Sequence, residues 1–101
     1  MAIHLFCYTS RSINESSHFI ELLIRNNQEL FQDRFLISKA TEANEVEKEV
    51  AHEHRINATT IFLIRVNDKS ATPLISEVAA IVKNSFGKST IVILQENEVE
   101  R

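Results

Sequence analysis

Two stretches of the sequence are apolar and β-branched almost without interruption, residues 59–66 (TTIFLIRV) and residues 90–95 (TIVILQ). A strand with one face in water alternates apolar and polar residues, whereas a continuous apolar run of this length is expected where both faces of a sheet are covered. Such runs are typical of parallel sheets between two layers of helices. These two segments therefore predict the central strands of an α/β sandwich.

The rest of the chain alternates between strand and helix patterns. Residues 2–9 (AIHLFCYT) have the length and composition of a first strand, and residues 34–40 (RFLISKA) those of a short edge strand. Helices are predicted from Ile13 to about Gln32, from about Thr41 to Arg55, and from Pro73 to Phe86. Strands and helices thus follow one another in strict alternation.

Local signals mark the ends of these helices. Ser12 and Glu15 have the spacing of a capping box, in which each side chain accepts a hydrogen bond from the other residue's backbone N–H. Asn26–Asn27 are weak helix formers and should divide the first helix. Thr72 is a candidate N-cap before Pro73, and Gly87, the single glycine of the chain, is placed to end the last helix.

This order favours a three-layer α/β/α sandwich with a four-stranded parallel, flavodoxin-like sheet in the strand order 2-1-3-4, because crossovers between parallel strands are right-handed. A ferredoxin-like antiparallel sheet is the alternative, since periodicity does not reveal strand direction. With 101 residues, the chain is expected to form a single domain over residues 1–101, with residues 96–101 as a flexible tail. One core is expected, containing Phe6, Leu23, Ile61, Leu63, Val78, Val82, Ile91 and Ile93.

Composition excludes several classes of protein. The formal net charge of −3 argues against unspecific binding to nucleic acid, and a single glycine leaves no phosphate loop. No apolar run approaches the roughly 18 residues that span a membrane, and the N-terminus lacks a signal peptide pattern. One cysteine permits no internal disulfide, and His52 and His54 would point to different sides of a helix. We therefore expect a cytoplasmic protein with no metal, cofactor, membrane or nucleic-acid partner.

Polar residues follow two of the predicted strands and are candidates for a ligand site. In an open parallel sheet, ligands bind beyond the carboxyl ends of the strands, where the strand order reverses. Ser10 and Arg11 follow the first strand, and Asp68 and Ser70 follow the third. Arg11 near a helix N-terminus could hold an anion there, although hydroxyl-rich and charged loops are also ordinary structural features.

Two segments resemble known enzyme families. Cys7, in IHLFCYTSRS, resembles the cysteine of phosphocysteine carriers of the sugar phosphotransferase IIB type and has the C-x-x-S spacing of monothiol redox proteins. The segments HLFCYTSR, INATTIFLIRVNDKS, LISEVAAIVKN and STIVIL resemble Toll/interleukin-receptor domains and nucleoside deoxyribosyltransferase-like folds. The second resemblance implies cleavage of an N-glycosidic bond, with Glu77 as the catalytic glutamate and Ser10, Arg11 and Ser70 lining the pocket. A cysteine within an apolar run is also typical of an inert core thiol.

The second predicted helix is strongly acidic. Five glutamates occur within twelve residues whose only Lys or Arg is Lys48: Glu42, Glu45, Glu47, Glu49 and Glu53. A solvated helix face accounts for many such runs, but these carboxylates would also suit a basic protein partner. The apolar stripe of this helix is limited to Ala43, Val46, Val50 and Ala51, so we expect it to be the least buried helix.

The sequence therefore favours a small, acidic, non-catalytic protein-binding module, such as an inhibitor or immunity protein that neutralises a basic toxin or nuclease. The alternative is a flavodoxin-like enzyme that acts on a nucleotide or another phosphorylated ligand through the loops at the strand ends. A regulatory module that docks onto a larger complex is a third possibility. The partner-binding hypothesis is preferred because no set of residues has the spacing of a complete catalytic site.

Overall fold

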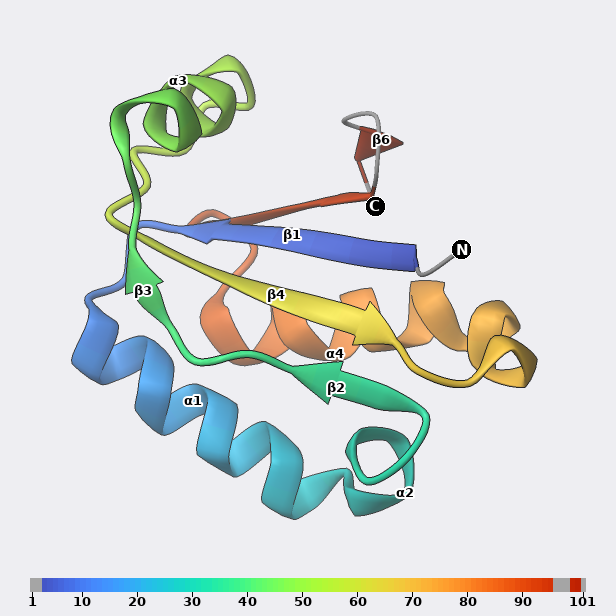
Figure 1. Ribbon diagram of the computed structural model, residues 1–101. Coiled ribbons are helices and arrows are strands. Elements are labelled where there is room, and N and C mark those ends of the chain that lie inside the picture. The colour runs from blue at the N-terminus through green and yellow to red at the C-terminus, as the bar shows by residue number, and fades with distance from the viewer. Residues whose placement is uncertain (1–2, 96–98, 101) are drawn as a thin grey trace.

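The computed structural model describes residues 3–95 and 99–100 (Figure 1). The strands are β1 (Ile3–Thr9), β2 (Phe35–Ile37), β3 (Thr41–Glu42), β4 (Thr60–Val66), β5 (Ile91–Gln95) and β6 (Val99–Glu100). The helices are α1 (Ile13–Asn26), α2 (Gln28–Phe31), α3 (Glu45–Glu53), the 3₁₀ helix η1 (Lys69–Leu74) and α4 (Ile75–Phe86). Of the predicted tail, residues 96–98 and 101 lie outside the described residues, and Val99–Glu100 form β6.

The sheet corrects the predicted strand arrangement. All neighbouring strands are antiparallel, in the order β2-β4-β1-β5-β6, and β3 pairs with the same edge of β4 as β2 does. The parallel, flavodoxin-like sheet of order 2-1-3-4 is therefore wrong, and the ferredoxin-like alternative has the strand directions that are found. A central antiparallel strand that is covered on both faces carries the same continuous apolar run as a parallel one, so the sequence pattern did not distinguish the two.

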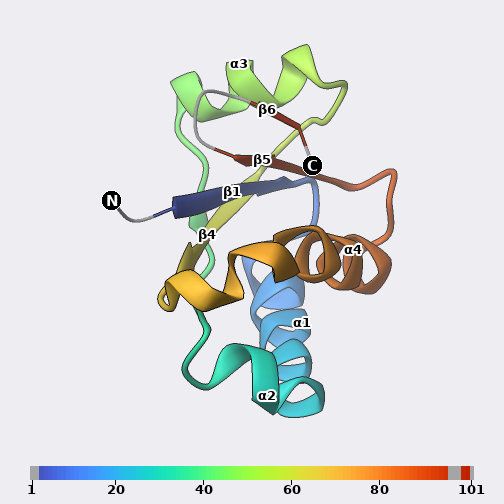
Figure 2. The ribbon, with the colours of Figure 1, turned by 90° about the vertical axis from the view of Figure 1, so that its right-hand side faces the viewer.

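The helices divide the apolar side chains between two clusters. Helices α1, α2 and α4 cover one face of the sheet, and α3 lies on the other (Figures 1 and 2). The larger cluster includes Leu23, Val78, Val82, Ile91 and Ile93 beneath α1 and α4. The smaller cluster, beneath α3, consists of Tyr8, Ala51, Ile56, Ala58, Val92 and Leu94.

The expectation of one core is therefore wrong for three of its eight residues. Phe6 and Ile61 are only partly buried and pack against the smaller cluster, and Leu63 is also only partly buried. Side chains alternate between the faces of a strand, so the neighbours of Leu63 on β4, Phe62 and Ile64, enter the larger cluster instead. A continuous apolar run thus indicates that both faces of a strand are covered, but it does not indicate which face is buried more completely.

Most of the predicted helix ends are confirmed. Ser12 and Glu15 form the expected capping box, and α1 ends at Asn26, with Asn27 separating it from α2. Gly87 ends α4 with φ +95°, in the left-handed region that glycine adopts without strain. Helix α4 begins at Ile75 and not at Pro73, which lies inside η1, where the Thr72 hydroxyl donates to the Lys69 carbonyl at 2.8 Å.

Helix α3 occupies the turn of a long β-hairpin. One strand of this hairpin is β2 followed by β3, and the other is β4. Between the two paired parts, three residues (38–40) lie opposite two (62–63), which makes a β-bulge. At this bulge the Ser38 N–H donates to the Leu63 carbonyl, and the Leu63 N–H donates to the Ser38 hydroxyl oxygen, both at 2.8 Å. The predicted helix start at Thr41 is therefore too early, because Thr41–Glu42 pair with β4 and Asn44 caps α3.

Candidate functional site

Three of the predicted glutamates form one row on α3. Glu45, Glu49 and Glu53 are four residues apart, so their side chains lie one above another along one face of the helix. All three residues are exposed, and the Glu45 side chain retains 94% of its accessible surface. Lys48 Nζ lies 4.0 Å from Glu45 Oε1, which is a long contact between two exposed groups. This row therefore presents negative charge to solvent.

The other two predicted glutamates are placed differently. The Glu47 side chain accepts a hydrogen bond of 2.8 Å from the backbone N–H of Asn44, whose own side chain accepts one of 2.8 Å from the Glu47 N–H. Glu47 thus completes a capping box that starts α3 and is not part of the row. Glu42 lies on β3, where it is exposed.

Two adjoining hollows give this region its shape. One, of about 620 Å³, separates α3 from the segment that leads into β4; it is lined by Glu45, Lys48, Glu49, His52, Glu53, Asn57, Ala58 and Thr59. The second, of about 720 Å³, lies at the N-terminus of α1; it is lined by Ser10, Ser12, Ile13, Asn14, Glu15, Glu42, Thr59 and Thr60. Both hollows include Thr59, so the carboxylates that border them form one surface. We call it the acidic surface: Glu15, Glu42, Glu45, Glu49 and Glu53.

The predicted ligand loops do not meet. Because β1 and β4 are antiparallel, Thr9 pairs with Thr60 at one end of the strands and Ile3 pairs with Val66 at the other. Ser10 and Arg11 thus follow β1 at one end of the sheet, whereas Asp68 and Ser70 follow β4 at the opposite end, roughly 20 Å away at the rise of a strand. One ligand of nucleotide size is therefore too short to contact both loops.

Both loops have structural roles. The Arg11 guanidinium donates to the Phe86 carbonyl from Nε at 3.2 Å and from Nη2 at 3.0 Å, and lies 5.6 Å above the centre of the Phe19 ring. It thus joins the start of α1 to the end of α4. The Asp68 carboxylate accepts a hydrogen bond of 3.0 Å from the Ser70 N–H, which lowers the pKa of Asp68 and caps η1.

The two candidate catalytic residues lie in different surroundings. Cys7 is completely buried in the larger cluster, and burial raises the pKa of its thiol well above the ordinary value. Glu77 is exposed in the first turn of α4 and lines a polar hollow of about 560 Å³ that also includes Arg25 and Arg34. Across the described ranges, no three His, Cys, Asp or Glu side chains are grouped closely enough to hold a metal ion. The structure brings neither residue together with the predicted ligand loops.

Comparison with known proteins identifies the family. Residues 1–99 match the family model described as the CDI system immunity component. The chain belongs to this immunity family. It is 40% identical, over all 101 residues of both chains, to the protein named immunity protein CdiI-2 of Burkholderia pseudomallei (strain 1026b). It also resembles a chain in the solved CdiA-CT/CdiI toxin and immunity complex from Burkholderia pseudomallei, with 38% identity over 97% of this chain and 95% of that one.

The family match confirms the predicted immunity-type function. The TM-score of 0.93 to the chain of the toxin and immunity complex shows that the two proteins share a fold. That fold has the antiparallel sheet described above, so the flavodoxin-like basis of the alternative enzyme hypothesis is wrong. Within the described part of the immunity protein, no helix is long and apolar enough to cross a membrane.

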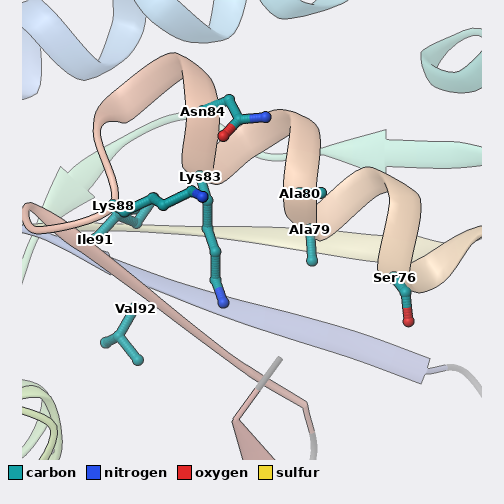
Figure 3. A pocket seen from close by; sticks show the side chains of 8 residues that line it. All are labelled: Ser76, Ala79, Ala80, Lys83, Asn84, Lys88, Ile91 and Val92. Atoms are coloured by element: carbon teal, nitrogen blue, oxygen red, sulfur yellow. The ribbon is translucent and has the colours of Figure 1, made fainter.

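The immunity protein has a further hollow whose lining includes lysines rather than glutamates. It measures about 570 Å³ and lies between α4 and β5 (Figure 3). Lys83 and Lys88 border it together with the small side chains of Ser76, Ala79 and Ala80, and Lys83 extends from α4 toward the sheet. The lysines give this third hollow a positive charge, whereas the acidic surface is negative, so the two regions suit ligands of opposite charge.

Sequence reasoning missed two parts of the site. Glu15 was identified only as a helix cap, yet it borders the same hollow as Glu42. Val46 was assigned to the apolar stripe of its helix, yet it is 67% exposed beside the acidic row. The helical spacing of Glu45, Glu49 and Glu53 was the one signal that could have separated the row from the other two predicted glutamates.

Proposed function

We propose that this immunity protein neutralises a toxin by binding a basic region of the toxin through the acidic surface. The row of Glu45, Glu49 and Glu53, exposed and bordering a hollow that adjoins a second one lined by Glu15 and Glu42, is the observation that carries the proposal. Support comes from the similarity to a chain of the CdiA-CT/CdiI toxin and immunity complex. Concentrated charge of one sign accelerates encounter with a partner of the opposite sign and disfavours other partners.

We further propose that the protein acts in the cytoplasm. Its single cysteine is a free thiol, as is usual in a reducing compartment, and burial keeps it protonated at neutral pH.

The test is the association rate of the immunity protein with its own toxin domain, measured by stopped flow at several salt concentrations. In the variant Glu45→Lys/Glu49→Lys, we expect association to slow by roughly tenfold to hundredfold at low salt and its salt dependence to weaken. The melting temperature should stay nearly unchanged because both side chains are solvated.

The matched control is Glu21→Lys/Glu29→Lys. These two residues are also exposed, lie on α1 and α2 away from the acidic surface, and change the net charge by the same amount. The control should associate at close to the rate of the wild type. If both variants slow association equally, net charge and not this surface would be responsible; if neither does, the acidic surface is not the toxin-binding site.

A further inference from the structure

Helix α3 covers only part of its face of the sheet. Figure 1 shows α3 above the end where β1 finishes and β4 begins, with no helix over the rest of that face. Burial varies across this face: Tyr8, Val92 and Leu94 of the smaller cluster are buried, whereas Phe6, Ile61 and Leu63 are only partly buried. An apolar part of the sheet is therefore accessible beside the helix among the described residues.

The strand register shows which side chains share this accessible face. Phe6 of β1 is paired with Leu63 of β4, so both side chains point to the same face. On the next strand, Leu36 of β2 is paired with Arg65, and both side chains point to this face as well. Leu36 is 42% exposed. We call Phe6, Leu36 and Leu63 the open sheet face.

Helix α3 adds an apolar border to the open sheet face. Val46 and Val50 are four residues apart and form a second row, about 100° around the helix from the acidic row. Val50 packs against the smaller cluster together with Phe6, which places this row on the side of α3 that adjoins the sheet. Val46, 67% exposed, therefore stands between the acidic row and the apolar sheet.

Large exposed hydrophobic side chains are concentrated in this region. Ile13, Ile24, Leu36 and Val46 are the exposed ones in the described part of the chain. Leu36 belongs to the open sheet face, Val46 borders it, and Ile13 lines the hollow that contains Glu15 and Glu42. Three of these four residues thus lie in or beside the acidic surface and the open sheet face. Exposed hydrophobic residues that were scattered singly over the protein would not be grouped in this way.

Charge alone does not make a long-lived complex. Complementary charges mainly raise the association rate, whereas slow dissociation depends on a few apolar contacts at a centre from which water is excluded. Stable interfaces accordingly have an apolar centre with a polar rim. The acidic surface has the composition of a rim, and the open sheet face with Val46 has the composition of a centre.

We infer that the toxin places apolar side chains on the open sheet face, Leu36 included, and against Val46, while its flanking basic residues meet the acidic surface. This inference rests on the proposed function and names the part of the interface that sets the lifetime of the complex. The occupant is a segment of the toxin in which apolar residues are bordered by Lys or Arg, as the adjoining carboxylates require.

The test separates the two parts of the interface by their kinetics. In Leu36→Thr/Val46→Thr, both substitutions replace an exposed apolar side chain by a polar one and leave the net charge unchanged. We expect dissociation of the toxin complex to accelerate about tenfold or more, with little change in the association rate. Ile24→Thr, on the outer side of α1 and 38% exposed, is the matched control and should dissociate like the wild type.

Other outcomes would overturn the inference. Dissociation of Leu36→Thr/Val46→Thr at the wild-type rate would show that the toxin does not contact this face. A wild-type dimer that the same variant converts to a monomer would show that a second copy covers it. Tighter toxin binding after deletion of residues 96–101 would show that the chain's own end competes for it. The proposed function fails separately, if the wild type does not bind the toxin or if the lysine variant associates normally.

Discussion

Replacing Arg11 by Ala should destabilise the fold at the junction of α1 and α4. The guanidinium makes two hydrogen bonds to the Phe86 carbonyl, at 3.2 and 3.0 Å, and lies 5.6 Å above the Phe19 ring. Arg11 Nη1 also lies 3.5 Å from Glu15 Oε2, with both side chains partly exposed. One side chain thus joins the last turn of α4 to the first turns of α1.

The expected cost follows from these contacts. Hydrogen bonds from a charged donor are worth about 1.5–3 kcal/mol, a partly exposed cation–π contact about 0.5–1 kcal/mol, and an exposed ion pair about 0.3 kcal/mol. The Phe86 carbonyl also accepts a hydrogen bond of 2.6 Å from the Thr90 hydroxyl, so the substitution leaves no unpaired acceptor. Because the two hydrogen bonds share one acceptor and the Arg11 side chain is 35% exposed to competing water, we expect the free energy of unfolding to fall by about 2–3 kcal/mol, in the lower part of the range these contacts allow.

Thermal unfolding followed by circular dichroism checks this value. For a domain of this size, the loss corresponds to a melting temperature lower by roughly 10–15 °C. Arg25→Ala, which removes an exposed arginine from the last turn of α1, is the control and should shift the midpoint little. A melting temperature for Arg11→Ala within about 2 °C of the wild type would refute the structural role. Loss of anion or toxin binding at an unchanged midpoint would show that Arg11 is a ligand-binding residue.

Two further predictions concern the cores. Burial raises the pKa of the Cys7 thiol, so above about pH 8.5 the unfolded chain loses a proton that the folded protein keeps, and the free energy of unfolding should fall by up to about 1.4 kcal/mol per pH unit. Urea titrations should show this slope in the wild type and not in Cys7→Ala, and rapid thiol labelling of the native protein would contradict it. Val78→Ala, at a fully buried position, should lower the free energy of unfolding by about 2–3 kcal/mol. Leu63→Ala, on the open sheet face, should lower it clearly less. Equal urea midpoints for the two variants would show that the faces of β4 are assigned wrongly.

Local features of the fold could be read from the sequence because neighbouring residues determine them. The Ser12–Glu15 capping box, the interruption at Asn27 and the Gly87 helix end each depend on a few consecutive residues, and each is found. Strand direction and order depend on contacts between distant segments. Thr60–Val66 has a similar apolar pattern whether β1 runs parallel or antiparallel to it, so the pattern could not choose.

The candidate site was predictable to a similar extent. Four-residue spacing relates Glu45, Glu49 and Glu53 on any helix, so that row could be recognised from the sequence. The position of Glu15 beside Glu42 could not, because it depends on the pairing of β3 with β4. The exposure of Val46 could not either, since an apolar residue at core spacing is usually buried, and only the partial cover of the sheet by α3 leaves it outside.

The position of α3 in the turn of a hairpin has a consequence for how such a protein can change partners. The helix rests on its own small cluster and is joined to the rest of the chain through β3 and β4, whereas α1, α2 and α4 form the larger cluster on the other face. Substitutions on the outer rows of α3 therefore leave the larger cluster untouched. On the proposed function, recognition can diverge at Glu45, Val46, Glu49 and Glu53 while the scaffold stays constant, and the α3 segment of one relative is a natural unit to transplant into another.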